Sequence, residues 1–154
     1  MKKKESERPK IQVSIRKMTE SDIEGVLAID RKITGQDRAL TYATIPGSYV
    51  GGQLAMSVVA EAECLIVGFL LGEMVASPYL ETDIALVQII GVDPAYRQLR
   101  IGEKLVQAFL ECCKAQGVDS IHAMVSVHDG WMQSFLRSTH FKQGEMVEFV
   151  KHLD

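Results

Sequence analysis

The chain has 154 residues, a length typical of one domain, and its 47% hydrophobic and 24% charged residues are those of an ordinary globular protein. The formal net charge of -3 disfavours a broad nucleic-acid-binding surface. No apolar run approaches the length needed to span a bilayer, because Ile84–Val92 is short and contains Gln88. We therefore expect a protein that binds neither nucleic acid nor membrane.

The start of the chain is basic, but no apolar stretch follows it. We therefore interpret residues 1–10 as a short disordered tail and not as a secretory signal, and we expect residues 11–154 to form a single domain. Cys64, Cys112 and Cys113 cannot all pair within one chain, and no histidine spacing makes them a zinc site. We interpret them as reduced thiols of a cytoplasmic protein, and we expect no metal.

The first third of the chain indicates a strand and then a helix. Ile11–Met18 alternates apolar and polar residues, the period of a half-buried strand, and Thr19 or Ser21 can cap the helix that follows. The glycine-containing region Thr34–Gln53 shows no regular period. Two interpretations of this region stay open: a mobile segment that faces the substrate, or a plain surface loop.

The middle of the chain indicates three strands and a helix. Ser57–Ala62 and Leu65–Ala76 predict a hairpin, and Asp83–Val92 is nearly all apolar, as expected of a strand covered on both faces. Apolar residues at helical spacing predict a helix over Gly102–Gln116, which Gly117 would end.

The last elements are a strand over Ser120–Val127, a shorter helix over Gly130–Ser138 and a final strand over Glu145–Lys151. This order of elements predicts a mixed α/β sheet with helices on both faces. Residues 83–127 are expected to form a right-handed crossover whose two strands are parallel.

The stretch Ile90–Leu105 carries the chemistry. A buried strand ends at Pro94, a short turn carries Arg97 and Arg100, and an amphipathic helix begins at once. Free backbone N–H groups at a helix start bind anions, and the arginines add full positive charges beside them. The arrangement suits a pyrophosphate, although a turn of this kind can also be merely solvated. No fingerprint of an ATP or NAD site occurs elsewhere in the chain.

Val92-Asp93-Pro94, followed by Arg97, Ile101-Gly102 and Leu105, resembles the acetyl-CoA-binding motif of the GNAT acetyltransferases. The resemblance implies a GNAT-like fold of about seven strands with a central β-α-β coenzyme A unit, and it covers nearly the whole chain. It also implies acetyl-CoA as co-substrate. The residues that it assigns to acetyl-CoA are Ile90, Gly91, Val92, Arg97, Gln98, Leu99, Arg100, Ile101, Gly102, Glu103 and Asp129.

One position departs from the family's pattern. The first glycine of the family's Gly-x-Gly is Arg100 here, and only Gly102 is retained. If the turn needs a positive φ at this position, arginine carries a conformational cost. If the turn uses an ordinary helical φ instead, Arg100 keeps its amide and adds a cation.

The resemblance implies direct attack of an amine on the thioester, whose carbonyl a backbone amide near Val92 would polarise. The residues that usually transfer protons in the family are replaced, among others by Gln88, Met124 and Leu136. We therefore expect catalysis by positioning, with a water relayed through Gln88 or His128. The alternative interpretation of His128 is that it is an exposed residue that caps the next helix.

The function that follows is an N-acetyltransferase that moves an acetyl group from acetyl-CoA to a primary amine: a small molecule, an amino acid or a protein N-terminus. The alternative is a non-catalytic acyl-CoA-binding or regulatory module, because the usual acid and base are missing. Glu73 is a candidate for binding a cationic substrate, with a solvated strand carboxylate as the alternative. A homodimer is compatible with the sequence.

Overall fold

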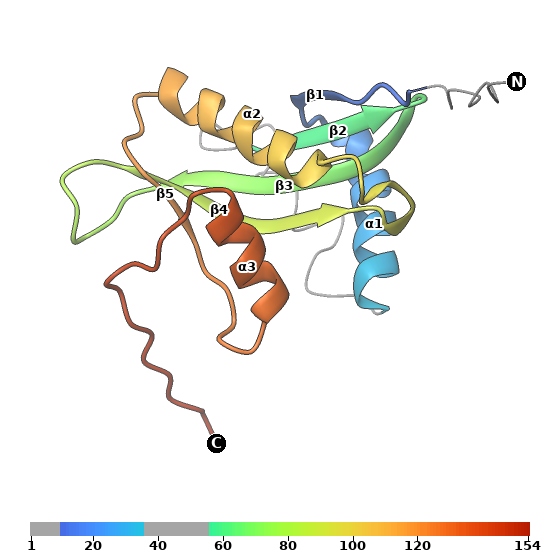
Figure 1. Ribbon diagram of the computed structural model, residues 1–154. Coiled ribbons are helices and arrows are strands. Elements are labelled where there is room, and N and C mark those ends of the chain that lie inside the picture. Colours follow the sequence, from blue (N-terminus) through green and yellow to red (C-terminus); the bar gives the residue numbers. More distant parts are fainter. Residues whose placement is uncertain (1–9, 36–55) are drawn as a thin grey trace, which may run out of the picture. The chain divides into compact units, whose positions relative to one another are not determined.

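A computed structural model describes residues 10–35 and 56–154 of the chain. These residues fall into two compact units, Met1–Met124 and Val125–Asp154, which are described separately. The first unit contains β1 (Ser14–Lys17), the 3-10 turn η1 (Glu20–Asp22), α1 (Ile23–Thr34), β2 (Val58–Ala62), β3 (Leu65–Val75), β4 (Ile84–Val92), the 3-10 turn η2 (Pro94–Tyr96), α2 (Ile101–Ala115) and β5 (Ile121–Ala123) (Figure 1). The second unit contains α3 (Gly130–Ser138).

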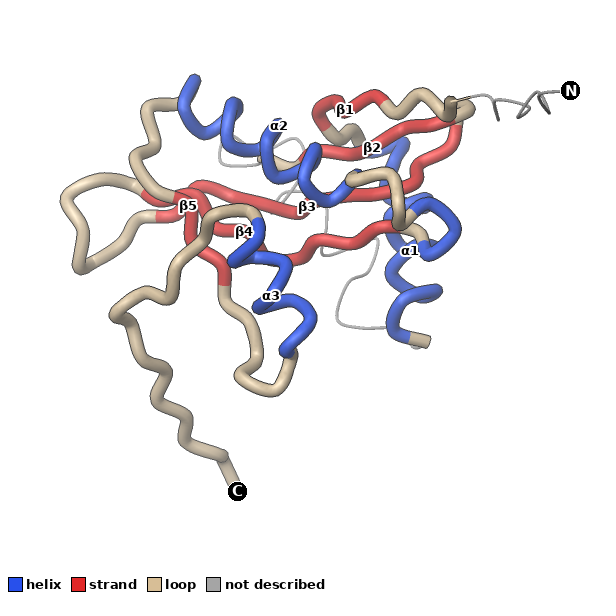
Figure 2. Tube along the Cα trace, viewed as in Figure 1, coloured by secondary structure: helices blue, strands red, loops and turns tan. Residues whose placement is uncertain are grey.

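The five strands form one sheet in the order β1-β2-β3-β4-β5 (Figure 2). The three junctions from β1 to β4 are antiparallel, and β4 and β5 are parallel, as the crossover prediction requires. The predicted hairpin is confirmed between β2 and β3. Its two turn residues, Glu63 and Cys64, have φ angles of 52° and 63°, the backbone of a two-residue turn that matches the twist of the strands.

Helices cover both faces of the sheet, as predicted. On one face α2 packs its four-residue-spaced stripe of Ile101, Leu105, Phe109 and Cys113 onto the strands. On the other face α1 packs against β3 and β4 (Figure 1). The core residues on the α1 side are Met18, Ile23, Val26, Ile29, Val59, Phe69 and Leu71.

A β-bulge interrupts the pairing of β3 with β4. Leu71 lies opposite Ile89 and Gly72 lies opposite Val87, so Gln88 is the extra residue of β4. The bulge changes which side chains face which helix. Val87 packs on the α2 side before the bulge, and the alternation resumes after it with Ile89 on the α1 side.

Three predicted features are wrong in the described residues. The strand expected over Ile11–Met18 is shorter, β5 ends at Ala123 and not at Val127, and Glu145–Lys151 forms no strand. The sheet therefore has five strands where about seven were expected. Alternating apolar residues favour an extended backbone, but a strand also needs a neighbour with which to pair.

The second unit is built around α3, which has the predicted bounds. The Asp129 side chain caps this helix by accepting a hydrogen bond from the Met132 N–H at 2.9 Å. Trp131 and Phe135, one turn apart, stack with ring centroids 6.0 Å apart. The expectations for the N-terminal tail and for most of Thr34–Gln53 lie outside the described residues.

Candidate functional site

The chain leaves β4 through Asp93, which is 8% exposed and contacts three elements. Its N–H donates to the Val67 carbonyl of β3 at 2.8 Å, its Oδ1 accepts from the Ala95 N–H at 3.0 Å, and its Oδ2 accepts from Lys32 Nζ of α1 at 2.9 Å. Burial raises the pKa of the Asp93 carboxyl, but the hydrogen bonds from Lys32 and Ala95 and the charges of Lys32 and Arg97 outweigh burial and hold this pKa below its usual value. An ionised Asp93 thus fixes the start of the turn into α2.

The turn ends at Arg100, which has a left-handed backbone with φ 56° and ψ 31°. The first of the two expected conformations is therefore found, and arginine occupies a backbone region that favours glycine. The Lys104 N–H donates to the Arg100 carbonyl at 3.1 Å, the first bond of the helical series. The N–H groups of Ile101, Gly102 and Glu103 precede this bond and are directed out of the helix start.

The side chains around this helix start divide by burial. Arg97, Gln98, Arg100 and Glu103 are exposed, and Gly102 is half-buried. Ile101 is 1% exposed, and it and Leu99 pack on the core beneath α2. The Leu99 N–H already donates to the Arg97 carbonyl at 2.6 Å, so Gly102 and Glu103 are the residues of the first helical turn whose N–H groups can meet a ligand. The result is two N–H groups without an intrahelical partner, those of Gly102 and Glu103, at the positive end of a 15-residue helix, with two arginines in the preceding turn. This chemistry suits a phosphate or pyrophosphate.

The edge of β4 is open beside this turn. β5 pairs only with Ala85, Leu86 and Val87, and no other strand of the described residues pairs with β4 on that side. Opposite residues of an antiparallel ladder alternate between bonded and non-bonded pairs, and the bond from Asp93 to Val67 sets this alternation. It directs the N–H and C=O groups of Ile90 and Val92 away from β3, toward the open edge.

Gly91 lies between these two residues, and its backbone groups have the opposite orientation. Its register partner is Phe69, so the alternation directs its backbone groups toward β3. An added Cβ at Gly91 would lie 2.8 Å from Phe69 Cε1 and 3.0 Å from Ile33 Cδ1. Gly91 therefore lets β4 approach α1 closely, a role that the spacing of the motif does not reveal.

The two expected catalytic candidates lie in different units. Gln88 is half-buried in the bulge of β4, and its Nε2 donates to Oε1 of Glu73 at 3.3 Å. His128 and Asp129 belong to the second unit, so their position relative to Gln88 stays a prediction. His128 is exposed, and its backbone N–H donates to Ser126 Oγ at 3.1 Å.

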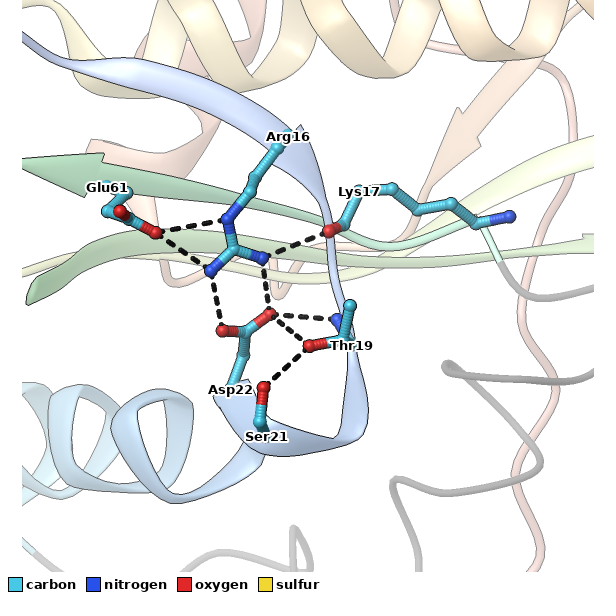
Figure 3. Close-up of polar contacts among 6 residues, drawn as sticks. All are labelled: Arg16, Lys17, Thr19, Ser21, Asp22 and Glu61. Atoms are coloured by element: carbon cyan, nitrogen blue, oxygen red, sulfur yellow. Dashed lines mark hydrogen bonds and ion pairs between the residues drawn. The ribbon is translucent and has the colours of Figure 1, made fainter. Parts of the chain in front are cut away.

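A polar cluster that no sequence pattern predicted joins β1 and the neighbouring β2 to the start of α1 (Figure 3). The Arg16 guanidinium donates to both carboxylate oxygens of Asp22 at 2.8 Å and to Glu61 Oε2 at 2.9 and 3.1 Å. The hydrogen bonds from Arg16, with one from the Thr19 N–H, hold the pKa of Asp22 below its usual value although burial raises it. Each charge of the cluster has a partner, which indicates a structural role.

The described residues give no sign of thiolate chemistry at Cys113 or of a metal site. Burial, with the neighbouring Cys112, raises the pKa of the Cys113 thiol to about 11, so this thiol is protonated at neutral pH. The described residues contain no group of three or more metal-ligating side chains. They also contain no helix of the length and apolar character that a membrane span requires.

The sheet, its two covering helices and the arginine-containing turn before α2 indicate the class of protein. The profile of the acetyltransferase (GNAT) family matches residues 35–141, and the chain belongs to this family. It is an acetyltransferase, and acetyl-CoA is its acetyl donor. The exposed N–H groups and arginines at the start of α2 fit the phosphates of coenzyme A, and the open edge of β4 fits an extended arm with amide groups.

Solved structures with the same fold include several aminoglycoside acetyltransferases. The aminoglycoside N-acetyltransferase AAC(6')-Iy in complex with CoA has a TM-score of 0.80 and 16% identity over 94% of this chain and 98% of its own. The 6'-N-acetyltransferase AAC(6')-Ih from Acinetobacter baumannii has a TM-score of 0.78 and 16% identity over 93% and 99%. An aminoglycoside acetyltransferase from an uncultured soil metagenomic sample, in complex with sisomicin, has a TM-score of 0.74 and 20% identity over 92% and 97%. No curated protein sequence matches the chain.

Proposed function

We propose that this protein transfers the acetyl group of acetyl-CoA to a primary amine by direct attack of the amine on the thioester. One observation carries the proposal: the open edge of β4 leads without interruption into the anion-binding turn before α2. A ligand with an extended amide-containing arm and a pyrophosphate at one end matches both features in this order. Coenzyme A has this composition.

The two features divide the binding of acetyl-CoA between them. The pyrophosphate accepts hydrogen bonds from the N–H groups of Gly102 and Glu103, with the charges of Arg97 and Arg100 beside it. The pantetheine arm lies along β4 as an additional strand and pairs with Ile90 and Val92, whose backbone groups face the open edge. Of the remaining residues of the turn, Gln98 is exposed and can contribute backbone, whereas Leu99 and Ile101 anchor the turn to the core. Asp129 is a candidate for a further contact with the arm.

This direction of binding places the thioester near the β-bulge. The arm runs from the turn toward Gln88, so that Val92 is met first and Ile90 second. The Ile90 N–H is then the free-edge amide nearest the thioester, and we assign to it the polarisation of the thioester carbonyl. As the amine nitrogen bonds to the carbonyl carbon, negative charge develops on the carbonyl oxygen and is stabilised by this N–H. No covalent bond to the protein is needed.

The acceptor is a primary amine of a small molecule, an amino acid or a protein N-terminus. Several aminoglycoside acetyltransferases have the same fold, so amino sugars are the first amines to assay. Identities of 16 to 20% show the fold alone. Gln88 stands where the family usually has a proton-transfer residue, and this favours the second candidate function, a module that binds acyl-CoA without turnover.

Turnover of acetyl-CoA distinguishes the two candidates. Release of free thiol is measured with a panel of aminoglycosides, polyamines, amino acids and peptides with free N-termini, and binding of CoA is measured by calorimetry. Thiol release with at least one amine supports the acetyltransferase, and CoA binding without turnover on any of them supports the binding module.

The position of the pyrophosphate is tested separately by Gly102→Trp, which places a bulky side chain at the first turn of α2. We expect the Kd for CoA to rise by about tenfold or more, because even about 1.4 kcal/mol of lost contact has this effect. Gly144→Trp is the matched control, because a Cβ at Gly144 meets no atom within 4 Å. An unchanged Kd in folded Gly102→Trp would refute the placement of the pyrophosphate.

A further inference from the structure

The Glu73 carboxylate lies near the proposed acetyl site, on the sheet face that α2 does not cover. Glu73 follows Gly72 on β3, and an added Cβ at Gly72 would lie 2.6 Å from Phe109 Cζ of α2. Met74, on the other side, packs into the α2-side core. Because side chains alternate along a strand, Glu73 points to the opposite face, the α1 side.

On the α1 side of the sheet, the α1 helix does not cover the part of β3 and β4 that contains Glu73 and Gln88. On the strands, the α1-side core reaches Leu71 of β3 and Ile89 of β4 and includes no residue on the other side of the bulge. In Figure 1, α1 crosses one end of the strands, whereas β3 and β4 extend well beyond it. Glu73 and Gln88 lie directly beyond this core, and both side chains are half-buried.

The bulge brings these two side chains together. If β4 had no bulge, Gln88 would pair with Gly72, and the Gln88 side chain would point to the α2 side. As the bulged residue, Gln88 donates from Nε2 to Oε1 of Glu73 at 3.3 Å. No donor of residues 10–35 and 56–154 bonds to Oε2 of Glu73, so one carboxylate oxygen is oriented by Gln88 and the other can accept a proton.

We infer that Glu73 removes the proton from the ammonium group of the substrate, with Gln88 as its positioning residue. This inference rests on the proposed function, because the Ile90 N–H marks the position of the thioester carbonyl. Gln88 precedes Ile90 by two residues, or about 7 Å along the strand. Glu73 itself lies opposite Leu86, four residues before Ile90, so it acts on an amine at the thioester through bridging water that starts at the carboxylate beside Gln88.

The proton balance of the reaction is complete with this assignment. The ammonium group gives one proton to Glu73 through the bridging water, and the neutral nitrogen attacks the carbonyl carbon. The nitrogen–carbon bond forms, the carbon–sulfur bond breaks, and its electron pair goes to sulfur. A second proton leaves the nitrogen and reaches the thiolate through solvent. Glu73 returns its proton to solvent, which leaves the amide, free coenzyme A and one proton as products.

The test compares Glu73→Gln and Glu73→Asp with the wild type on an amine that the wild type acetylates. For Glu73→Gln we expect kcat to fall by about 100-fold or more, loss of the acidic limb of the pH dependence of kcat, and an unchanged Kd for CoA. Glu73→Asp retains the carboxylate on a shorter chain and should keep the acidic limb at a reduced kcat. Glu81→Gln, in the exposed loop between β3 and β4, is the matched control and should leave kcat unchanged.

Gln88→Leu tests the positioning role, and we expect kcat to fall while the acidic limb moves in pH without disappearing. A wild-type kcat and pH profile in Glu73→Gln would overturn the inference, as would a rise in KM alone. These results are distinct from failure of the proposed function, in which the wild-type protein itself acetylates no amine. Circular dichroism and Tm confirm that each variant is folded.

Discussion

Replacing Arg100 by glycine should have two opposite effects, one on stability and one on binding. Arg100 has a φ of 56° at the start of α2, a conformation that costs an L-residue about 1–2 kcal/mol and glycine almost nothing. Glycine also gives the unfolded chain more freedom, which offsets about 0.4–1 kcal/mol of the gain. We therefore expect Arg100→Gly to raise the free energy of unfolding by about 0.5–1 kcal/mol and the Tm by about 1–4 °C.

The same substitution removes a positive charge from the proposed phosphate site. The Arg100 side chain is exposed, so solvent and salt screen its charge, and we assign about 1 kcal/mol to its interaction with the phosphates. This corresponds to about a fivefold rise in the Kd for CoA. The dependence of the Kd on salt concentration should also weaken, because one charge fewer faces the ligand.

Thermal unfolding and calorimetric titration with CoA measure the two effects on the same samples. Arg100→Lys keeps both the charge and the strained backbone and should change neither Tm nor Kd appreciably. Cys64→Gly relieves a φ of 63° in the β2–β3 hairpin and should raise the Tm without changing the Kd. A lower Tm in Arg100→Gly would refute the reasoning on strain, and a higher Tm with an unchanged Kd would refute the placement of Arg100 beside the phosphates.

Two further predictions concern stability. Gly72→Ala should lower the free energy of unfolding by about 1–3 kcal/mol in urea titrations, because the new Cβ would lie 2.6 Å from Phe109 Cζ, and Gly72→Ala combined with Phe109→Leu should recover part of the loss. Asp22→Asn should cost about 2 kcal/mol at pH 7, because it breaks the charged hydrogen bonds with Arg16. Because the folded-state pKa of Asp22 is lowered, its contribution is present above the unfolded value of 3.8 and is lost as pH falls through the folded value, so the variant and the wild type should converge in acid; a constant difference would contradict this.

Local patterns predicted most of the elements and the helix start at which we propose that the ligand binds. The apolar run before Pro94, the helical spacing from Ile101 and the α3 helix are each determined by neighbours in sequence, and all were found where expected. The free N–H groups at the start of α2 follow from the same local information, because every helix start leaves such groups unpaired. The family, too, could be recognised from one contiguous segment, Ile90–Leu105.

Contacts between distant segments could not be predicted in this way. Gln88 was identified as a lone substitute for a carboxylate, but its partner Glu73 is 15 residues away and becomes visible only through the β3–β4 register and its bulge. Arg16 meets Glu61 across 45 residues for the same reason. The final strand was predicted wrongly because alternation specifies which side chains share a face and contains no information about a pairing partner.

The chain thus determines by itself where the helices and most of the strands form and which helix start leaves N–H groups unpaired, because backbone propensity, capping and periodicity act over a few residues. Only the tertiary structure decided which backbone groups of β4 are free and which carboxylate stands beside them. These depend on strand register, and register is set by packing of the whole sheet between its two helices.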